Sequence, residues 1–183
     1  MVATVFSHPS VIQYTIFNEE DMTDVFTPAD VQALVSWLKD ADPSRLVDAD
    51  SGGVFNPLHL GDVNDQHAYP WPAAPAPSAT QYSMDGEFSG MGVWSGGSFW
   101  QRSGGCSFGH SMPSAEVFAA TYIEMLGNLT AFKIAPGVSA AIATQTTDIE
   151  SECDGFVAFD RTPKFDAGQI ARIRAANLAL VAA

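Results

Sequence analysis

Strand-like and helix-like segments alternate along this chain, and that alternation limits the folds open to it more than any other feature. Residues 11–17 form an apolar, β-branched run of strand length. Thr27-Pro28-Ala29-Asp30 is a typical helix start, with a hydroxyl cap, a proline in the first turn and an acid behind it. Further strand candidates are 45–47, 62–69, 81–88 and 140–144. A second helix is predicted to begin near Ser114, with one apolar side that consists of Phe118, Tyr122, Met125, Leu126 and Leu129. A terminal helix is predicted to begin at Asp166, which resembles a capping box with Gln169. Strands that alternate with helices predict an α/β domain with a parallel sheet.

Polar residues stand at or behind the carboxyl ends of these strand candidates. They are Asn18 and Glu19, Asp48 and Asp50, His67 and Tyr69, Glu87, and Gln145 and Asp148. The carboxyl ends of parallel strands meet at one edge of a sheet, where ligands bind in such folds. We therefore expect these side chains to line one polar pocket.

Two of these residues, Glu19 and Glu87, suggest a particular chemistry. Glycoside cleavage needs two carboxyl groups on opposite sides of the scissile bond, one to protonate the leaving oxygen and one to attack or stabilise the sugar carbon. Most glutamates are nevertheless solvated surface groups. Their spacing alone leaves both interpretations open.

Composition excludes several classes of protein. The 183 residues are 46% hydrophobic, enough for one domain with a core, and the net charge of −13 argues against a nucleic-acid partner. No apolar run approaches the roughly 18 residues of a membrane span, and no signal peptide opens the chain. Cys106 and Cys153 fit neither a disulfide framework nor a metal quartet. We expect no membrane partner, and a cytoplasmic, reducing compartment is the default.

Other constellations carry weaker signals. Asp62, Asp65 and His67 have metal-ligating side chains, but strand alternation sends Asp62 and Asp65 to opposite faces, so no metal site is predicted. Lys164 has the pattern of an ordinary surface charge. Three tryptophans in Gly- and Pro-rich loops can either stack on a sugar or pack within the loops: Trp71, Trp94 and Trp100.

Five segments resemble, in the same order, motifs of glycoside hydrolase family 2, the β-galactosidase-like enzymes. They are HPSVIQYTIFNE (8–19), DPSRLVDADSGG (42–53), GDVNDQHAYP (61–70), GEFSGMG (86–92) and TQTTDIESECDG (144–155), followed by FDR at 159–161. Each segment is a weak signal, but the ordered set covers nearly the whole chain. Ser7, Tyr14 and Asp154 differ from the residues that the family usually has at these places.

The resemblance implies a TIM (β/α)8 barrel, of which residues 1–183 form a single incomplete catalytic domain, truncated at the N-terminus and supplying roughly strands 4–8 with their helices. It also implies a retaining glycoside hydrolase acting on a β-glycoside, with Glu19 as acid/base, Glu87 as nucleophile and about 5–5.5 Å between the carboxyl groups. Asn18 is expected to bind the 2-hydroxyl of the sugar. The remaining expected substrate-binding residues are His67, Tyr69, Trp94 and Asp148, and no metal or cofactor is expected.

An incomplete barrel exposes strand edges that a closed one pairs. We therefore expect full activity only where a complementing chain or a homo-oligomer supplies the remaining strands. The alternative interpretation is an inactive barrel fragment that acts at most as a carbohydrate-binding or subunit-complementing module. The sugar and the linkage are not specified by these motifs.

Overall fold

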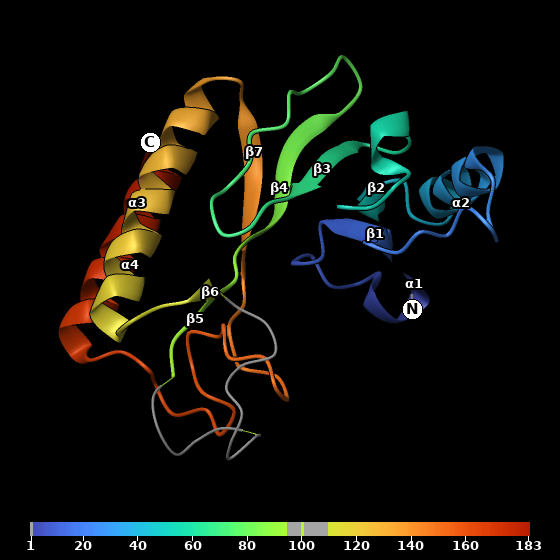
Figure 1. Ribbon diagram of the computed structural model, residues 1–183. Coiled ribbons are helices and arrows are strands. Elements are labelled where there is room, and N and C mark those ends of the chain that lie inside the picture. The colour runs from blue at the N-terminus through green and yellow to red at the C-terminus, as the bar shows by residue number, and fades with distance from the viewer. Residues whose placement is uncertain (1, 95–99, 101–109) are drawn as a thin grey trace. The chain divides into compact units, whose positions relative to one another are not determined.

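The computed structural model describes residues 2–94, 100 and 110–183, and the chain forms two compact units (Figure 1). Unit 1 comprises Met1–His67, Ala74–Gly86 and Pro136–Ala140. Unit 2 comprises Ala68–Ala73, Glu87–Ala135 and Ala141–Ala183. The expectation of a single incomplete domain stays a prediction.

Unit 1 begins with a parallel pair of strands joined by a helix. Strand β1 (Gln13–Asn18) pairs with β2 (Leu46–Ser51), and Asn18 lies opposite Ser51 at their carboxyl ends. Helix α2 (Pro28–Ala41) connects them and starts at the predicted Thr27 cap, where Thr27 and Asp30 form a capping box. The unit also holds α1 (Val2–Val5), the 3-10 turn η1 (Asn56–Leu58) and β3 (Val63–His67).

A three-stranded sheet has the order β3-β4-β7, with β4 at Tyr82–Ser89 and β7 at Val138–Thr144. Tyr82 N–H donates to the carbonyl of Asp62, and Ala68 N–H donates to that of Glu87, so β3 and β4 advance in the same direction. Unit 2 adds the short parallel pair β5 (Met91–Gly92) and β6 (His110–Ser111), and the helices α3 (Ala115–Ile134) and α4 (Ala167–Ala182). The predicted α/β class with parallel strands is confirmed.

Each unit has its own apolar core. In unit 1 it consists of Tyr14, Val31, Val35, Leu38, Val47, Ala49 and Phe55. In unit 2, α3 buries the face predicted from its spacing, namely Phe118, Tyr122, Met125, Leu126 and Leu129. Helix α4 begins with the predicted capping box between Asp166 and Gln169 and adds Ile173 to this core.

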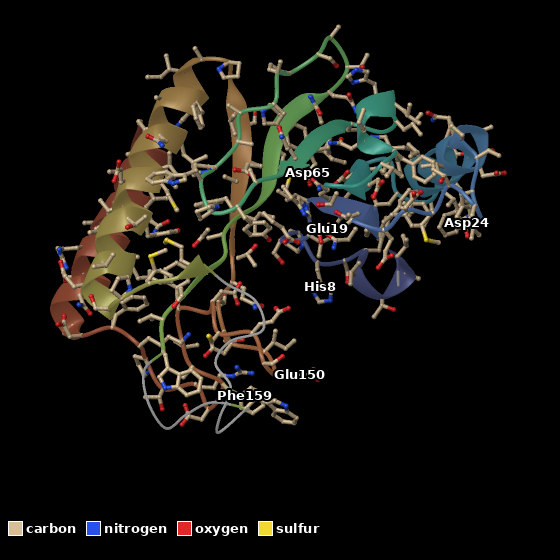
Figure 2. The ribbon with its side chains drawn as sticks, viewed as in Figure 1. His8, Glu19, Asp24, Asp65, Glu150 and Phe159 are labelled. Atoms are coloured by element: carbon tan, nitrogen blue, oxygen red, sulfur yellow. The ribbon has the colours of Figure 1, made fainter. Side chains whose placement is uncertain are left out.

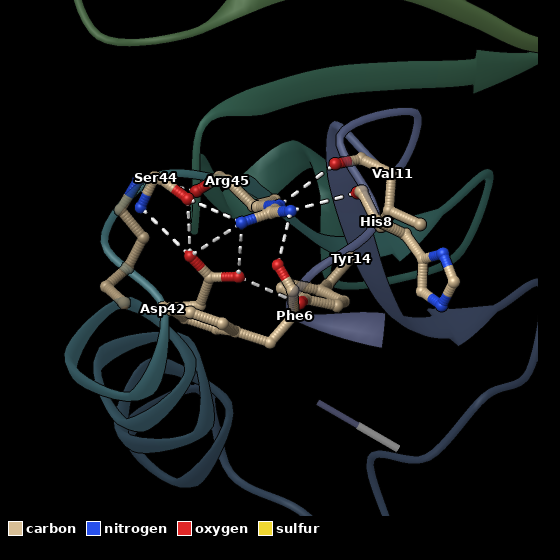
Figure 3. Close-up of polar contacts among 8 residues, drawn as sticks. Phe6, His8, Val11, Tyr14, Asp42, Ser44 and Arg45 are labelled. Carbon is tan, nitrogen blue, oxygen red and sulfur yellow. Dashed lines mark hydrogen bonds and ion pairs between the residues drawn. The ribbon is translucent and has the colours of Figure 1, made fainter. Parts of the chain in front are cut away.

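The DPSR segment has a structural role within unit 1 (Figure 3). Buried Asp42 accepts hydrogen bonds from the hydroxyls of Tyr14 (2.9 Å) and Ser44 (2.6 Å) and pairs with Arg45 at 3.1 Å. Arg45 also donates to the carbonyls of residues 6, 8 and 11, at 2.8, 3.0 and 2.9 Å. The guanidinium therefore ties the N-terminal segment to the end of α2.

Several sequence-based expectations are wrong. Strand β2 continues to Ser51, so Asp48 and Asp50 lie inside it and are fully buried, because both faces of this strand are covered. Lys164 is buried, not a surface charge. Cys153 takes part in a disulfide bond, although the sequence did not predict one, and Cys106 lies outside the described residues.

No helix among the described residues has the length and apolarity to cross a membrane.

Candidate active site

In unit 1, Glu19 and His67 come together at the carboxyl ends of two strands (Figure 2 labels Glu19). Glu19 follows β1 with a φ of 58°, and its N–H donates to the carbonyl of Ser51 at 3.0 Å. His67 is the last residue of β3, and its Nδ1 lies 2.6 Å from Glu19 Oε1. The His67 side chain is 5% exposed and that of Glu19 is 51% exposed, so the pair joins a buried ring to an accessible carboxyl.

Behind His67, two buried side chains extend this contact inward. His67 Nε2 lies 2.8 Å from Ser51 Oγ, and that hydroxyl donates to Asp65 Oδ2 at 2.6 Å. Asp65 is fully buried (labelled in Figure 2), and its own N–H donates to Asn56 Oδ1. We call Glu19, His67, Ser51 and Asp65 the proton network of unit 1.

Two further buried carboxyl groups, Asp48 and Asp50, lie beside this network. The pKa of Asp48 is raised mainly by burial and, to a smaller extent, by the nearby charge of Asp65. Burial also raises the pKa of Asp50, although Asp50 Oδ2 accepts the Phe55 N–H at 2.8 Å. Among the described residues, Asp48 Oδ2 and Asp65 Oδ1 have no hydrogen-bond donor. Burial and the neighbouring Asp65 carboxyl both favour a proton on Asp48, and that proton removes one buried charge.

Glycines make the room that these side chains need. A Cβ at Gly52 would lie 2.4 Å from the His67 ring, and one at Gly86 would lie 2.2 Å from Asp65 Oδ2. Gly52 also has a φ of 65°, which favours glycine. The glycines of the SGG and GEF motifs are therefore required by the packing of His67 and Asp65.

In unit 2, Glu87 is held by two hydroxyl groups. It lies within β4, and Tyr69 donates its phenolic hydrogen to Glu87 Oε2. Thr144, the last residue of β7, has its hydroxyl 3.1 Å from that of Tyr69 and 3.5 Å from Glu87 Oε2. These two hydroxyl groups fix the orientation of the Glu87 carboxyl group.

The other predicted site residues differ in their surroundings. Asn18 is exposed at the end of β1, and Trp94 is 46% exposed. Asp148 is buried: its Oδ1 accepts from Lys164 Nζ at 2.6 Å and from the Gly155 N–H at 2.9 Å. Trp100 packs edge-on against Phe159, with 5.1 Å between ring centroids, which favours loop packing for this tryptophan.

The structure thus brings together Glu19 with His67 in unit 1, and Glu87 with Tyr69 in unit 2. The expected separation of the two glutamates stays a prediction. Sequence reasoning missed three residues as site members, Ser51, Asp65 and Thr144. Each lies inside a quoted family-like segment, which was the available signal.

The three residues weighed as metal ligands, Asp62, Asp65 and His67, have different partners. That carboxylate instead contacts Lys39 Nζ and the Val47 N–H, both at 2.8 Å. Asp65 faces Ser51, and His67 faces Ser51 and Glu19. Asp62 therefore links α2 to β2 and is not a member of the proton network.

Comparison with known proteins gives local sequence similarity and extended structural similarity. No family model matches the chain. A beta-galactosidase of Aeromonas hydrophila subsp. hydrophila is 37% identical over 82 residues, which cover 41% of this chain and 7% of that protein.

The solved structures match nearly the whole chain. A GH2 beta-galacturonidase from Eisenbergiella tayi aligns with a TM-score of 0.68 at 16% identity, over 97% of this chain and 35% of its own. A beta-D-glucuronidase of Dictyoglomus thermophilum gives 0.65 at 14% identity (96% and 33%), and a putative beta-galactosidase from Bacteroides fragilis gives 0.62 at 15% (95% and 29%). This chain thus spans about a third of these proteins, and the likeness shows a shared fold.

Proposed function

We propose that this chain, which resembles part of the glycosidases of glycoside hydrolase family 2, carries both catalytic carboxyl groups of a retaining β-glycosidase. Glu19 is the acid/base and Glu87 the nucleophile. One observation carries the proposal: His67 and Tyr69 are separated by a single residue, and the first holds Glu19 whereas the second holds Glu87. His67, the last residue of β3, and Tyr69, two residues further on, therefore each supply a partner to one glutamate.

The proposed reaction has two steps. The Glu87 carboxylate attacks the anomeric carbon while the proton on Glu19 passes to the departing glycosidic oxygen, which leaves a covalent glycosyl-enzyme. Glu19, now a carboxylate, takes a proton from water as that water attacks the same carbon, and Glu87 is released. Tyr69 and Thr144 hold Glu87 Oε2 throughout.

The substrate is a carbohydrate β-glycoside of the β-galactosidase type. Exposed Asn18 is proposed to bind the sugar 2-hydroxyl, and exposed Trp94 offers a stacking face. His67 and Tyr69 act on the bound sugar indirectly, because they position Glu19 and Glu87. Asp148 completes the proposed substrate-binding set.

The proposed barrel topology rests on the same resemblance to glycoside hydrolase family 2. We propose that β1, β2, β3, β4 and β7 correspond to strands 4–8 of a (β/α)8 barrel, in which residues 1–183 form one incomplete domain. Support comes from the parallel pairing of β1 with β2 and from the connecting helices α2 and α3. A complementing chain or a second copy supplies the missing strands for full turnover.

Mechanism-based labelling tests the proposal. Activated 2-fluoro galactoside, glucuronide and galacturonide, chosen from the substrates that the relatives' names indicate, should add one sugar to the intact mass, on the peptide containing Glu87. Glu87→Gln should abolish the label. Glu19→Ala should still be labelled, because a good leaving group needs no acid.

Two results would reject the enzyme. A label that persists in Glu87→Gln would place the nucleophile elsewhere. Absence of label with all three sugars would leave only the carbohydrate-binding or complementing module, which equilibrium binding of the unmodified sugars would then detect.

A further inference from the structure

We propose that Ser51 and Asp65 are positioning residues that hold a proton on Nε2 of His67, and thereby make Nδ1 the atom that exchanges a proton with Glu19. The inference rests on the proposed acid/base role of Glu19. It assigns a role to two side chains that touch neither the sugar nor the exposed carboxyl, and its test does not require turnover.

The argument begins with the single proton of the Ser51 hydroxyl. Ser51 Oγ lies 2.6 Å from Asp65 Oδ2 and 2.8 Å from His67 Nε2, so it takes part in two short contacts. A carboxylate can only accept a hydrogen bond, so the hydroxyl proton points to Asp65. The oxygen of Ser51 is then an acceptor, and His67 Nε2 must carry the donor proton.

Asp65 acts as the acceptor because its buried neighbour carries a proton instead. Asp48 and Asp65 are both buried, and each has one oxygen without a donor among the described residues. Burial and the charge of Asp65 favour the protonated form of Asp48. In this arrangement Asp65 is the acceptor on both sides, from the Ser51 hydroxyl and from the proton of Asp48.

The charges around the ring are consistent with this assignment. Within unit 1, the carboxyl groups facing His67 are Glu19 and, through Ser51, Asp65, while Asp50 interacts with the ring at longer range. Gly52 packs against the ring, where a Cβ would be 2.4 Å away, so the imidazole has little freedom to turn.

This arrangement suits both steps of the proposed reaction. In the neutral ring, Nδ1 has a lone pair and accepts the proton of Glu19 Oε1, so the acid form of Glu19 is held ready. In the charged ring, the same proton lies on Nδ1 and is donated to the Glu19 carboxylate. The proton on Nε2 stays in place in both states, and only the outer proton moves over the 2.6 Å contact.

The tautomer can be observed directly by ¹⁵N-edited NMR of the histidine ring nitrogens in the full chain. The chain has four histidines, and His67→Gln identifies the signals of His67. At a pH where the ring is neutral, we expect a protonated Nε2 and an unprotonated Nδ1, whose nitrogen shifts are widely separated.

Asp65→Asn should reverse the pattern. Protonated Asp48 donates to the amide carbonyl, so the amide NH2 faces Ser51, the hydroxyl turns to His67 Nε2, and the ring proton moves to Nδ1. Asp50→Asn is the matched control and should leave the Nε2 proton in place, since Asp50 Oδ2 accepts the backbone N–H of Phe55. A folded Asp65→Asn that keeps the wild-type tautomer would overturn the proposal.

Ser51→Ala covers the case in which Asp65→Asn does not fold. Without the hydroxyl, we expect the two neutral tautomers to be mixed, whereas an unchanged, pure Nε2–H signal would refute the role of Ser51. An Nδ1–H tautomer in the wild-type chain would refute it outright. A failed sugar label would leave these tautomer results intact, so failure of this proposal and of the proposed function are distinguishable.

Discussion

Replacing Lys164 by Met should destabilise the chain far more than removing an exposed cation. Lys164 Nζ lies 2.6 Å from Asp148 Oδ1 and 2.8 Å from the Cys153 carbonyl, and the side chains of the ion pair are 0% and 1% exposed. Burial lowers the pKa of Lys164, and the contact with Asp148 opposes that shift. In Lys164→Met, the carboxylate of Asp148 remains buried with the Gly155 N–H as its main partner.

The magnitude follows from that stranded charge. Removing one member of a buried pair typically costs about 3–5 kcal/mol, a large share of a stability of roughly 5–15 kcal/mol. For a chain of this length, that loss lowers the melting temperature by roughly 6–20 °C. Because a proton can neutralise the stranded carboxylate, the loss should be smaller at acidic pH than at pH 7.

Urea and thermal unfolding followed by circular dichroism would measure the effect. Arg172→Met is the matched control, because Arg172 pairs with Glu116 where both side chains are about half exposed, and it should change stability by about 0–1 kcal/mol. The double variant Lys164→Met/Asp148→Asn should regain most of the loss, since Asn keeps the acceptor for Gly155.

The reasoning would be refuted by a Lys164→Met variant as stable as Arg172→Met. The same series tests the substrate role predicted for Asp148. If Asp148→Asn alone weakened sugar binding without changing stability, the ion pair would be secondary and the predicted contact with the sugar would hold.

Three further outcomes are expected. Gly52→Ala should lower the free energy of unfolding by about 1–3 kcal/mol, because its Cβ would meet the His67 ring and its φ is positive. The control Gly127→Ala in α3, which has open space around it, should raise that free energy by about 0.5–1 kcal/mol. Equal effects of the two variants in thermal unfolding would contradict the packing argument. Asp48 has its pKa raised from 3.8 to about 8, so its contribution to stability should fall as pH rises through that interval, and Asp48→Asn should flatten the pH dependence of urea unfolding between pH 5 and 8; a parallel dependence in both proteins would speak against it. Trp94→Ala should leave the unfolding midpoint within about 0.5 kcal/mol of wild type and weaken sugar binding, and unchanged binding would remove Trp94 from the site.

Local patterns in the sequence determined the elements that depend on near neighbours. The capping boxes of α2 and α4 join residues three apart, Thr27 with Asp30 and Asp166 with Gln169, so reading the sequence was enough to place both helix starts. The apolar face of α3 was readable for the same reason, because its spacing is set by the helix itself. The positions of Glu19, His67 and Glu87 near strand ends were likewise visible, because each lies at or next to the end of a strand candidate.

Only the tertiary structure decided which polar side chains are buried and which partner each one has. Nothing in the sequence distinguishes Asp48, Asp50 and Lys164 from surface charges, yet all three are buried in the folded chain. The contacts of the proton network join residues 14, 16 and 48 positions apart. Such pairings depend on how strands align across a sheet, and a single sequence does not encode that alignment in any local pattern.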